Sequence, residues 1–321
     1  MSNVLAITGP IYLSIAVGFV ATRSGFMSKV DAQVLGRFVL SFALPAMLFN
    51  ALASRDFQEV IHPVYLAAYA LGSLVAFGTM WALGRWIVGH DMTLRAFMGM
   101  GSSCSNTGYI GYPILLQVIG PSAGVGLALC LLVENLLMIP LSLSLAESGQ
   151  AGSLSWQRQV IESFKRMARA PLMWAIVLGF FFSMMGWHWP QPLARTIDLF
   201  AAACAGTALF VNGASLVGLR VQGLVSQVSG IALAKLILHP SAVAFFLWLL
   251  GPIEPRLQIS AIVLAAMPML GIYPLFAQRF GRDGFCAAAL LMTTLLSFFT
   301  ISALLWGLSG WPAGQSVMLG N

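Results

Sequence analysis

The chain contains ten runs of about twenty apolar residues, separated by short segments that hold almost all of its charges. A run of this length can cross a bilayer as a helix, because a helix satisfies its backbone hydrogen bonds internally. Only 8% of the 321 residues are charged, and the mean hydropathy is +0.88. We therefore expect an all-α polytopic membrane protein. The expected spans are Val4–Thr22, Val30–Leu52, Pro63–Val88, Leu94–Ile119, Ser122–Leu145, Pro171–Trp187, Leu193–Leu219, Ser226–Leu250, Leu257–Phe280 and Phe285–Leu308.

The remaining composition argues against several other classes of protein. A net charge of +6 could suggest nucleic acid, but the lysines and arginines stand apart between apolar runs and form no basic face. The four cysteines lie inside apolar runs without metal-ligand spacing. The chain has no glycine-rich phosphate loop, zinc motif or nucleophile elbow. We expect a protein that is not an enzyme, needs no cofactor or metal, and contacts membrane lipid rather than nucleic acid.

The cations predict the orientation of the chain in the membrane. No cation precedes the first span, whereas Arg23 and Lys29 follow it, which is the wrong order for a cleaved signal peptide. With the N-terminus outside, twelve of the 16 cations fall on the cytoplasmic side, three fall outside, and Lys235 lies within a span. We expect both termini outside the plasma (inner) membrane and the longest loop, residues 146–168, in the cytoplasm.

An internal repeat relates the two halves of the sequence. Shifting the chain by 161 positions places Pro10 on Pro171 and brings the pattern Tyr-Pro-x-x-x-Gln-x-x-Gly from residues 112–120 onto residues 273–281. Each half then holds five spans, and an odd number forces the second half to insert upside down. The prediction is a 5+5 inverted repeat, with residues 1–145 and 169–321 as the repeats and residues 146–168 as the connecting loop.

Two spans in equivalent positions, the fourth and the ninth, are interrupted by glycine and proline. The interruptions cover Asn106–Pro113 and Met267–Pro274, where freed backbone groups need protein or a watery cavity to satisfy them. Paired broken helices are typical of substrate sites near the bilayer midplane, and the helix N-termini there suit a carboxylate. The predicted substrate-binding residues are Asn106, Thr107, Gly108, Gly111, Pro113, Met267, Pro268, Gly271, Tyr273 and Pro274.

Two charged side chains fall inside predicted spans. Glu134, beside Asn135, lies in the middle of the fifth span, where a central charge costs about 2.5 to 3.5 kcal/mol or more. It is a candidate for proton coupling; the alternative is a structural hydrogen bond from a protonated Glu134 to the fourth helix. Lys235 in the eighth span can neutralise a substrate carboxylate, pair with Glu134, or extend to the headgroups. We rank His239 below it. We expect Asn50 and Asn212, at nearly equivalent places in the second and seventh spans, to bond between helices; the alternative is that they face the substrate path.

These motifs resemble the auxin efflux carrier family, which includes plant PIN proteins and bacterial malonate-carrier-like permeases. The resemblance rests on residues 105–113, on the Glu134-Asn135 pair before Pro140, and on Lys235 before Pro240. It implies a fold similar to that of bile-acid symporters, with spans 1, 2, 6 and 7 as a scaffold and spans 3–5 and 8–10 as a transport domain. The fourth and ninth helices would cross at their breaks, and the transport domain would move organic anions by an elevator-like shift.

The sequence departs from this family in its third span, because residues 64–81 carry no charge whereas plant members have an acidic and a basic residue there. We predict a proton-coupled carrier of small organic anions, malonate-like or auxin-like, that forms a homodimer through its scaffold helices. A sodium-coupled symporter is the nearest alternative. An anion channel and a receptor that binds the anion without moving it are alternatives from other classes.

Overall fold

The computed structural model describes residues 2–55, 62–149, 165, 168–187, 189–219 and 225–310, and over these residues it is helical. The α-helices are α1 (Ser2–Arg23), α2 (Lys29–Phe38), α3 (Leu44–Ala53), α4 (Pro63–Val88), α5 (Met92–Ser103), α6 (Tyr112–Ile119), α7 (Ala123–Val133), α8 (Ile139–Ser148), α10 (Pro171–Met185), α11 (Gln191–Ala202), α12 (Cys204–Ser215), α13 (Val225–Leu233), α14 (His239–Leu250), α15 (Pro255–Ala265), α16 (Tyr273–Gln278) and α17 (Asp283–Ser309). Shorter turns link some of them, namely the π-helices η1 (Val39–Ala43), η3 (Thr107–Gly111), η5 (Glu134–Met138) and η6 (Ala234–Leu238) and the 3-10 turn η4 (Gly120–Ser122). The predicted all-α fold is confirmed. Most of the predicted loop 146–168 lies outside the described residues.

Seven helices in the described part of the chain are long and apolar enough to cross a membrane. One of them, Thr107–Ser148, has 42 residues and contains a turn at Gly120, so it covers the end of the expected fourth span and all of the fifth. Shorter helices, α5, α10 and α15, stand in the remaining expected windows. The protein is polytopic, and the count of ten spans stays a prediction.

Four prolines inside the apolar helices are each preceded by a π-helical turn. Pro45, Pro113, Pro140 and Pro240 are the second residues of α3, α6, α8 and α14, which follow η1, η3, η5 and η6. The residue before each proline donates its N–H five positions back, as Tyr112 does to the Thr107 carbonyl. The wider turn leaves room for a proline ring that would otherwise clash with the carbonyl four residues earlier. These prolines therefore lie within continuous helices.

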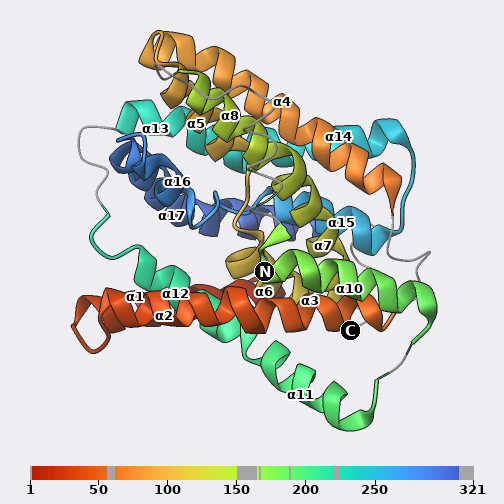
Figure 1. Ribbon diagram of the computed structural model, residues 1–321. Coiled ribbons are helices and arrows are strands. Elements are labelled where there is room, and N and C mark those ends of the chain that lie inside the picture. Colours follow the sequence, from red (N-terminus) through yellow and green to blue (C-terminus); the bar gives the residue numbers. More distant parts are fainter. Residues whose placement is uncertain are drawn as a thin grey trace.

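The helices are arranged in two outer layers with a middle layer between them. In Figure 1, α1, α2, α3, α10, α11 and α12 form the lower layer, and α4, α5, α8, α13 and α14 form the upper layer. Between the layers lie α6, α7, α15, α16 and α17. The main packing pairs keep to this arrangement: α1 packs on α12 and α10 on α3 below, while α4 packs on α5 and α14 above. The candidate site described below lies in the middle layer.

Two close helix crossings in the lower layer involve residues related by the 161-residue shift. A Cβ atom on Gly18 of α1 would lie 2.0 Å from the carbonyl oxygen of Phe210 in α12. A Cβ atom on Gly179 of α10 would lie 2.8 Å from Leu52 Cβ in α3, with the carbonyl oxygen of Phe49 beside it at 3.4 Å. Gly179 and Phe210 follow Gly18 and Phe49 by 161 positions each. A side chain at either glycine would be too close to the neighbouring helix, so the shift relates contacts as well as residue types.

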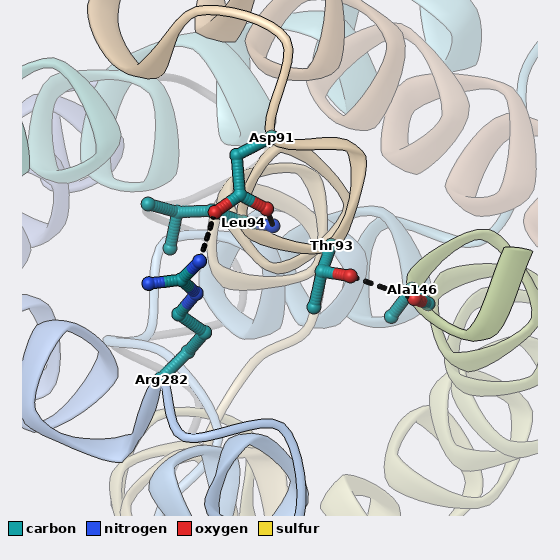
Figure 2. Close-up of polar contacts among 5 residues, drawn as sticks. All are labelled: Asp91, Thr93, Leu94, Ala146 and Arg282. Carbon is teal, nitrogen blue, oxygen red and sulfur yellow. Dashed lines mark hydrogen bonds and ion pairs between the residues drawn. The ribbon is translucent and has the colours of Figure 1, made fainter. Parts of the chain in front are cut away.

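A polar cluster at one end of the upper layer joins three segments that are far apart in the sequence (Figure 2). Asp91 caps α5 by accepting from the Leu94 N–H at 2.8 Å, and its other carboxylate oxygen pairs with Arg282 just before α17. The Thr93 hydroxyl donates to the Ala146 carbonyl in α8 at 2.9 Å. These contacts hold the ends of α5, α8 and α17 together where polar residues can reach water.

Candidate functional site

The interruptions of the two broken helices meet in the middle layer. After α5 ends at Ser103, Cys104 is extended, and the next helical turn begins at Thr107. The Asn106 N–H donates to the Pro268 carbonyl at 2.7 Å, and the Leu270 N–H donates to the Cys104 carbonyl at 3.3 Å. These bonds form an isolated antiparallel bridge between the two segments. Each broken helix thus satisfies backbone groups of the other, as groups buried away from water require.

The first interruption lies earlier than the sequence indicates. Its unwound residues are 104–106, and Pro113 stands six residues beyond Thr107, inside a helix that continues to Ile119. The prediction that Pro113 marks the break is therefore wrong, because the π-helical turn before it absorbs the proline. The second interruption, residues 266–272, agrees better with the prediction, since Pro274 comes in the first turn of α16.

A cavity of about 230 Å³ borders the crossing. Four polar residues line it, Asn106, Thr107, Glu134 and Asn135, and the rest of its wall is mainly apolar. Pockets for drug-sized ligands have about 300 to 1,000 Å³, so this cavity suits a smaller molecule. Larger cavities lie elsewhere, of about 580 Å³ and about 690 Å³. We regard the smaller one as the candidate site because the broken helices and the buried carboxyl group meet there.

Glu134 contacts the unwound part of the fourth helix. It is the first residue of η5, it is 1% exposed, and its carboxyl group accepts from the Ser105 N–H at 2.7 Å. The Thr107 hydroxyl lies 3.4 Å from the other carboxyl oxygen. The contact with the fourth helix, which the sequence offered as one alternative, is present. Glu134 also lines the cavity.

Lys235 binds three protein groups on the other side of the crossing. Its ammonium group is fully buried and donates to the Ser105 hydroxyl at 2.7 Å, to the Ala265 carbonyl at 2.7 Å and to His239 Nδ1 at 2.8 Å. An ammonium group has three hydrogens and accepts nothing, so these bonds use its whole capacity. The alternative that Lys235 extends to the headgroups is wrong. Lys235 and Glu134 meet through Ser105, which binds one at its hydroxyl and the other at its N–H.

His239 completes this buried network. Since its Nδ1 accepts from Lys235, the ring proton lies on Nε2, which donates to the Ser73 hydroxyl at 2.9 Å. The network reaches from α4 through η6 and α14 to the crossing. It links the second half of the chain to the broken helix of the first half, a role the sequence did not reveal.

The predicted substrate residues separate into two groups. Six residues of the candidate set line the cavity, namely Asn106, Thr107, Gly108, Glu134, Asn135 and Gly271. Others build the crossing behind it: Gly111, Pro113, Met267, Pro268, Tyr273, Pro274 and Lys235 are absent from its lining. Tyr273, for example, is fully buried and donates its hydroxyl to the Phe97 carbonyl at 2.6 Å. The cavity thus takes side chains mainly from the fourth and fifth spans.

Three further residues complete the site. Ser105 joins Glu134 to Lys235, although the sequence marks it only as part of the broken segment. Tyr109 lines the cavity and donates its hydroxyl to the Gly36 carbonyl of α2 at 3.2 Å. Asn212 of α12 accepts a hydrogen bond from the Asn106 amide at 2.9 Å. The expected bond between helices is therefore present, and its partner is the predicted site residue.

Residues 6–305 match the family described as membrane transport protein. The chain belongs to this family, which is the auxin efflux carrier family that the motifs of the fourth and fifth spans resemble. The protein is therefore a membrane transporter, and its family is one of transporters rather than enzymes.

Similar proteins carry transporter names. The chain is 26% identical over 310 residues to the "Putative malonate transporter" of Rhizobium meliloti, with 95% of this chain and 96% of the relative covered. It is 24% identical to the "Uncharacterized transporter YfdV" of Escherichia coli strain K12, with 92% and 94% covered. An "Uncharacterized transporter" of Methanothermobacter thermautotrophicus is also 24% identical, with 91% and 93% covered. The similarity extends over nearly the full length of each relative.

Proposed function

We propose that this transporter is a secondary carrier of small organic anions and that it holds its substrate at the crossing of the two broken helices. The observation that carries the proposal is the meeting of both interruptions beside a cavity lined by Asn106, Thr107 and Glu134. Paired broken helices at such a place typically bind the substrate of a carrier. A full-length relative with malonate in its name supports a carboxylate as the substrate class.

The start of the helix at Thr107 favours an anionic group in the cavity. The first N–H groups of a helix have no partner within it and carry a partial positive charge. Asn106, Thr107 and Gly108, which begin this helix of thirteen residues, all line the cavity. A substrate carboxylate at this end would gain hydrogen bonds and a favourable electrostatic interaction. The small cavity volume favours a compact acid such as malonate over a bulky one.

The two outer layers give the proposed carrier a fixed part and a moving part. We assign the lower layer (α1–α3 and α10–α12) as the scaffold, which is also where a homodimer would form, and the remaining helices as the transport domain. In the proposed orientation both termini are outside, because twelve of the 16 cations then lie in the cytoplasm.

Proton coupling through Glu134 is part of the proposal. Its carboxyl group is buried, lines the cavity, and has no cation in direct contact among the described salt bridges. A buried carboxylate without a charged partner is costly inside a membrane, so protonation lowers the cost of moving it. A proton bound to Glu134 would cross together with the substrate and be released on the other side.

Lys235 argues against the sodium-coupled alternative. A sodium ion at the crossing would bind oxygen atoms freed by the unwound backbone. The Ala265 carbonyl is such an oxygen and the Ser105 hydroxyl lies beside it, and both already accept from the Lys235 ammonium at 2.7 Å. The Lys235 side chain therefore occupies oxygen atoms at the place where a sodium-coupled carrier would hold its ion.

Uptake into proteoliposomes tests this proposal. A thermal-shift screen of carboxylates on the purified protein would identify a ligand, and the radiolabelled ligand would then be offered under an inward proton gradient. We expect saturable uptake that continues when sodium is replaced by choline and falls when the proton gradient is collapsed. Uptake that requires sodium would favour the symporter alternative, and a flux that does not saturate would favour a channel.

A further inference from the structure

A pair of asparagines joins the candidate site to the lower layer. Asn106 begins the helix at the crossing, and Asn212 lies in α12; their amides share one hydrogen bond of 2.9 Å. Asn106 is 1% exposed and Asn212 is 4% exposed. Within the proposed carrier, this is a buried polar contact between the transport domain and the scaffold.

Each amide has one polar atom without a hydrogen-bond partner. Asn106 Oδ1 and Asn212 Nδ2 are buried and have no hydrogen-bond partner among the described residues. Turning both amides around exchanges the atoms but again leaves one carbonyl oxygen and one NH₂ group unpaired. A buried polar group without a partner destabilises the folded protein, and a bound ligand is one of the reasons such a group is retained.

The two atoms that share the asparagine hydrogen bond lie next to a residue that lines the cavity. A Cβ atom on Gly271 would be 3.3 Å from Asn106 Nδ2 and 3.9 Å from Asn212 Oδ1. Gly271 and Asn106 both line the cavity, so the asparagine pair stands at the boundary between the cavity and α12. A substrate group that enters between the two amides would contact both halves of the proposed carrier at once.

We propose that Asn212 is a substrate-binding residue and that the asparagine pair recognises one carboxyl group of the substrate in its protonated form. This inference rests on the proposed function. A carboxylic acid offers one O–H donor and one carbonyl acceptor, which complement the free carbonyl of one asparagine and the free NH₂ of the other. A carboxylate has only acceptors and would leave the asparagine carbonyl unpaired, and an ester would do the same.

The chemistry singles out a class of substrate. It is a dicarboxylic acid that enters as a monoanion, with its charged carboxylate at the helix start near Thr107 and its neutral carboxyl group at the asparagine pair. A primary carboxamide has the same pattern of one donor side and one acceptor side, so the half-amide of the acid should bind in the same way. Because the hydrogen-bonded atoms of the pair lie nearest to Gly271, the asparagine bond must open before the group can reach the free carbonyl and the free NH₂.

Equilibrium binding to the purified protein tests this inference with three probes: malonate, its half-amide and its methyl half-ester. We expect malonate to bind more tightly at acidic than at alkaline pH, because only the acidic solution contains the monoanion. The half-amide should bind at both pH values with little change, and the half-ester about tenfold or more weakly than the half-amide, since one buried acceptor stays unpaired.

Variants separate recognition by Asn212 from a packing role. Asn212→Ala should weaken malonate and the half-amide about tenfold and remove their advantage over the half-ester. The control is Thr93→Ala in α5, which also removes a buried hydrogen bond between helices, to the Ala146 carbonyl at 2.9 Å, and which should leave the affinities unchanged. Where Asn212→Ala does not fold, Gly271→Ala takes its place, because the added methyl group would press against the asparagine pair.

The outcomes distinguish this inference from the proposed function. If malonate binds but the half-amide and half-ester bind equally well, or if the variants leave the affinities unchanged or tighter, the asparagine pair does not recognise a protonated carboxyl group and the inference is wrong. The carrier function would stand in that case. If the carboxylate screen gives a ligand other than malonate, the acid, half-amide and half-ester of that ligand are compared instead. If no carboxylate binds the wild-type protein, both proposals fail together.

Discussion

Ser105 is the residue through which the buried charges of this transporter meet. Its N–H binds Glu134 and its hydroxyl binds Lys235, so a single residue of the unwound segment separates a carboxyl group from an ammonium group. Buried ionic groups are stable only when their hydrogen bonds are complete, and the three bonds of Lys235 meet that condition. The polar network therefore fixes the position of the broken helix relative to η6.

Replacing Lys235 should destabilise the protein strongly. Lys235→Met keeps the length of the side chain but leaves the Ser105 hydroxyl, the Ala265 carbonyl and His239 Nδ1 without their donor. Removing one partner of a buried ionic network costs about 3 to 5 kcal/mol. Thermal unfolding in detergent measures the loss. The control, Lys29→Met at an exposed position, should change stability by less than about 0.5 kcal/mol, and equal losses in the two variants would contradict the role given to the network.

Replacing Glu134 should remove the dependence of uptake on the proton gradient. Glu134→Gln keeps a hydrogen-bonding group of the same shape but cannot bind and release a proton. In the wild type, acidifying the outside should raise uptake, because Glu134 takes up its proton there and loses it inside. In the variant, uptake should no longer respond to the gradient, while exchange of substrate across the membrane continues. Glu147→Gln is the control, since Glu147 pairs with Arg279 in a partly exposed position. A gradient response retained by Glu134→Gln would refute this route.

At the scale of the elements, the prolines separate what could be predicted from the sequence from what could not. Apolar runs and charge asymmetry predict the helices and their windows, because they follow from the bilayer alone. The place of the first interruption does not follow, because a proline in a membrane helix can be absorbed by a π-helical turn, as Pro113 is. What ends α5 at Ser103 is the backbone pairing of residues 104–106 with the other broken helix, a tertiary contact that no local pattern contains.

The same distinction applies to the site. Asn106, Thr107 and Glu134 are predictable because polar residues in an apolar window have few roles besides function or helix pairing. The sequence shows Asn212 as a polar residue in an apolar span. It does not show that Asn212 bonds to Asn106, which lies 106 positions earlier. The same holds for the tight helix crossings of the lower layer. The sequence shows their glycines but not the residues that these glycines pack against.

The glycine crossings predict a stability difference between two alanine substitutions in one helix. Gly18→Ala would put a methyl group 2.0 Å from the Phe210 carbonyl oxygen, so α1 would have to move away from α12. Overpacking of this kind costs about 1 to 3 kcal/mol. Gly9→Ala, also in α1, meets nothing within 4 Å and should be neutral or slightly stabilising. Thermal unfolding of the two variants compares them, and equal stabilities would show that α1 and α12 do not pack as described.

At the scale of the whole molecule, the crossing of the broken helices lies between two cavities. The cavity at the crossing borders both the middle layer and residues of the lower layer, such as Leu40 and Leu44. A larger cavity of about 580 Å³ lies on the other side of the same broken helix, where Tyr112 and Leu116 line it together with Asn50 and Arg55. In the proposed orientation the two cavities face opposite sides of the membrane. A substrate held at the crossing would pass from one to the other as the transport domain moves against the scaffold.

Counterflow in proteoliposomes tests the central claim most directly. Vesicles that contain the purified protein are loaded with unlabelled malonate, diluted, and given a trace of labelled malonate outside. A carrier with its site at the crossing should accumulate label transiently in the wild type, and Asn106→Ala should reduce this accumulation at least tenfold, while Thr93→Ala retains it. Absence of counterflow with every carboxylate from the screen, or undiminished counterflow in Asn106→Ala, would contradict the proposed carrier and its site.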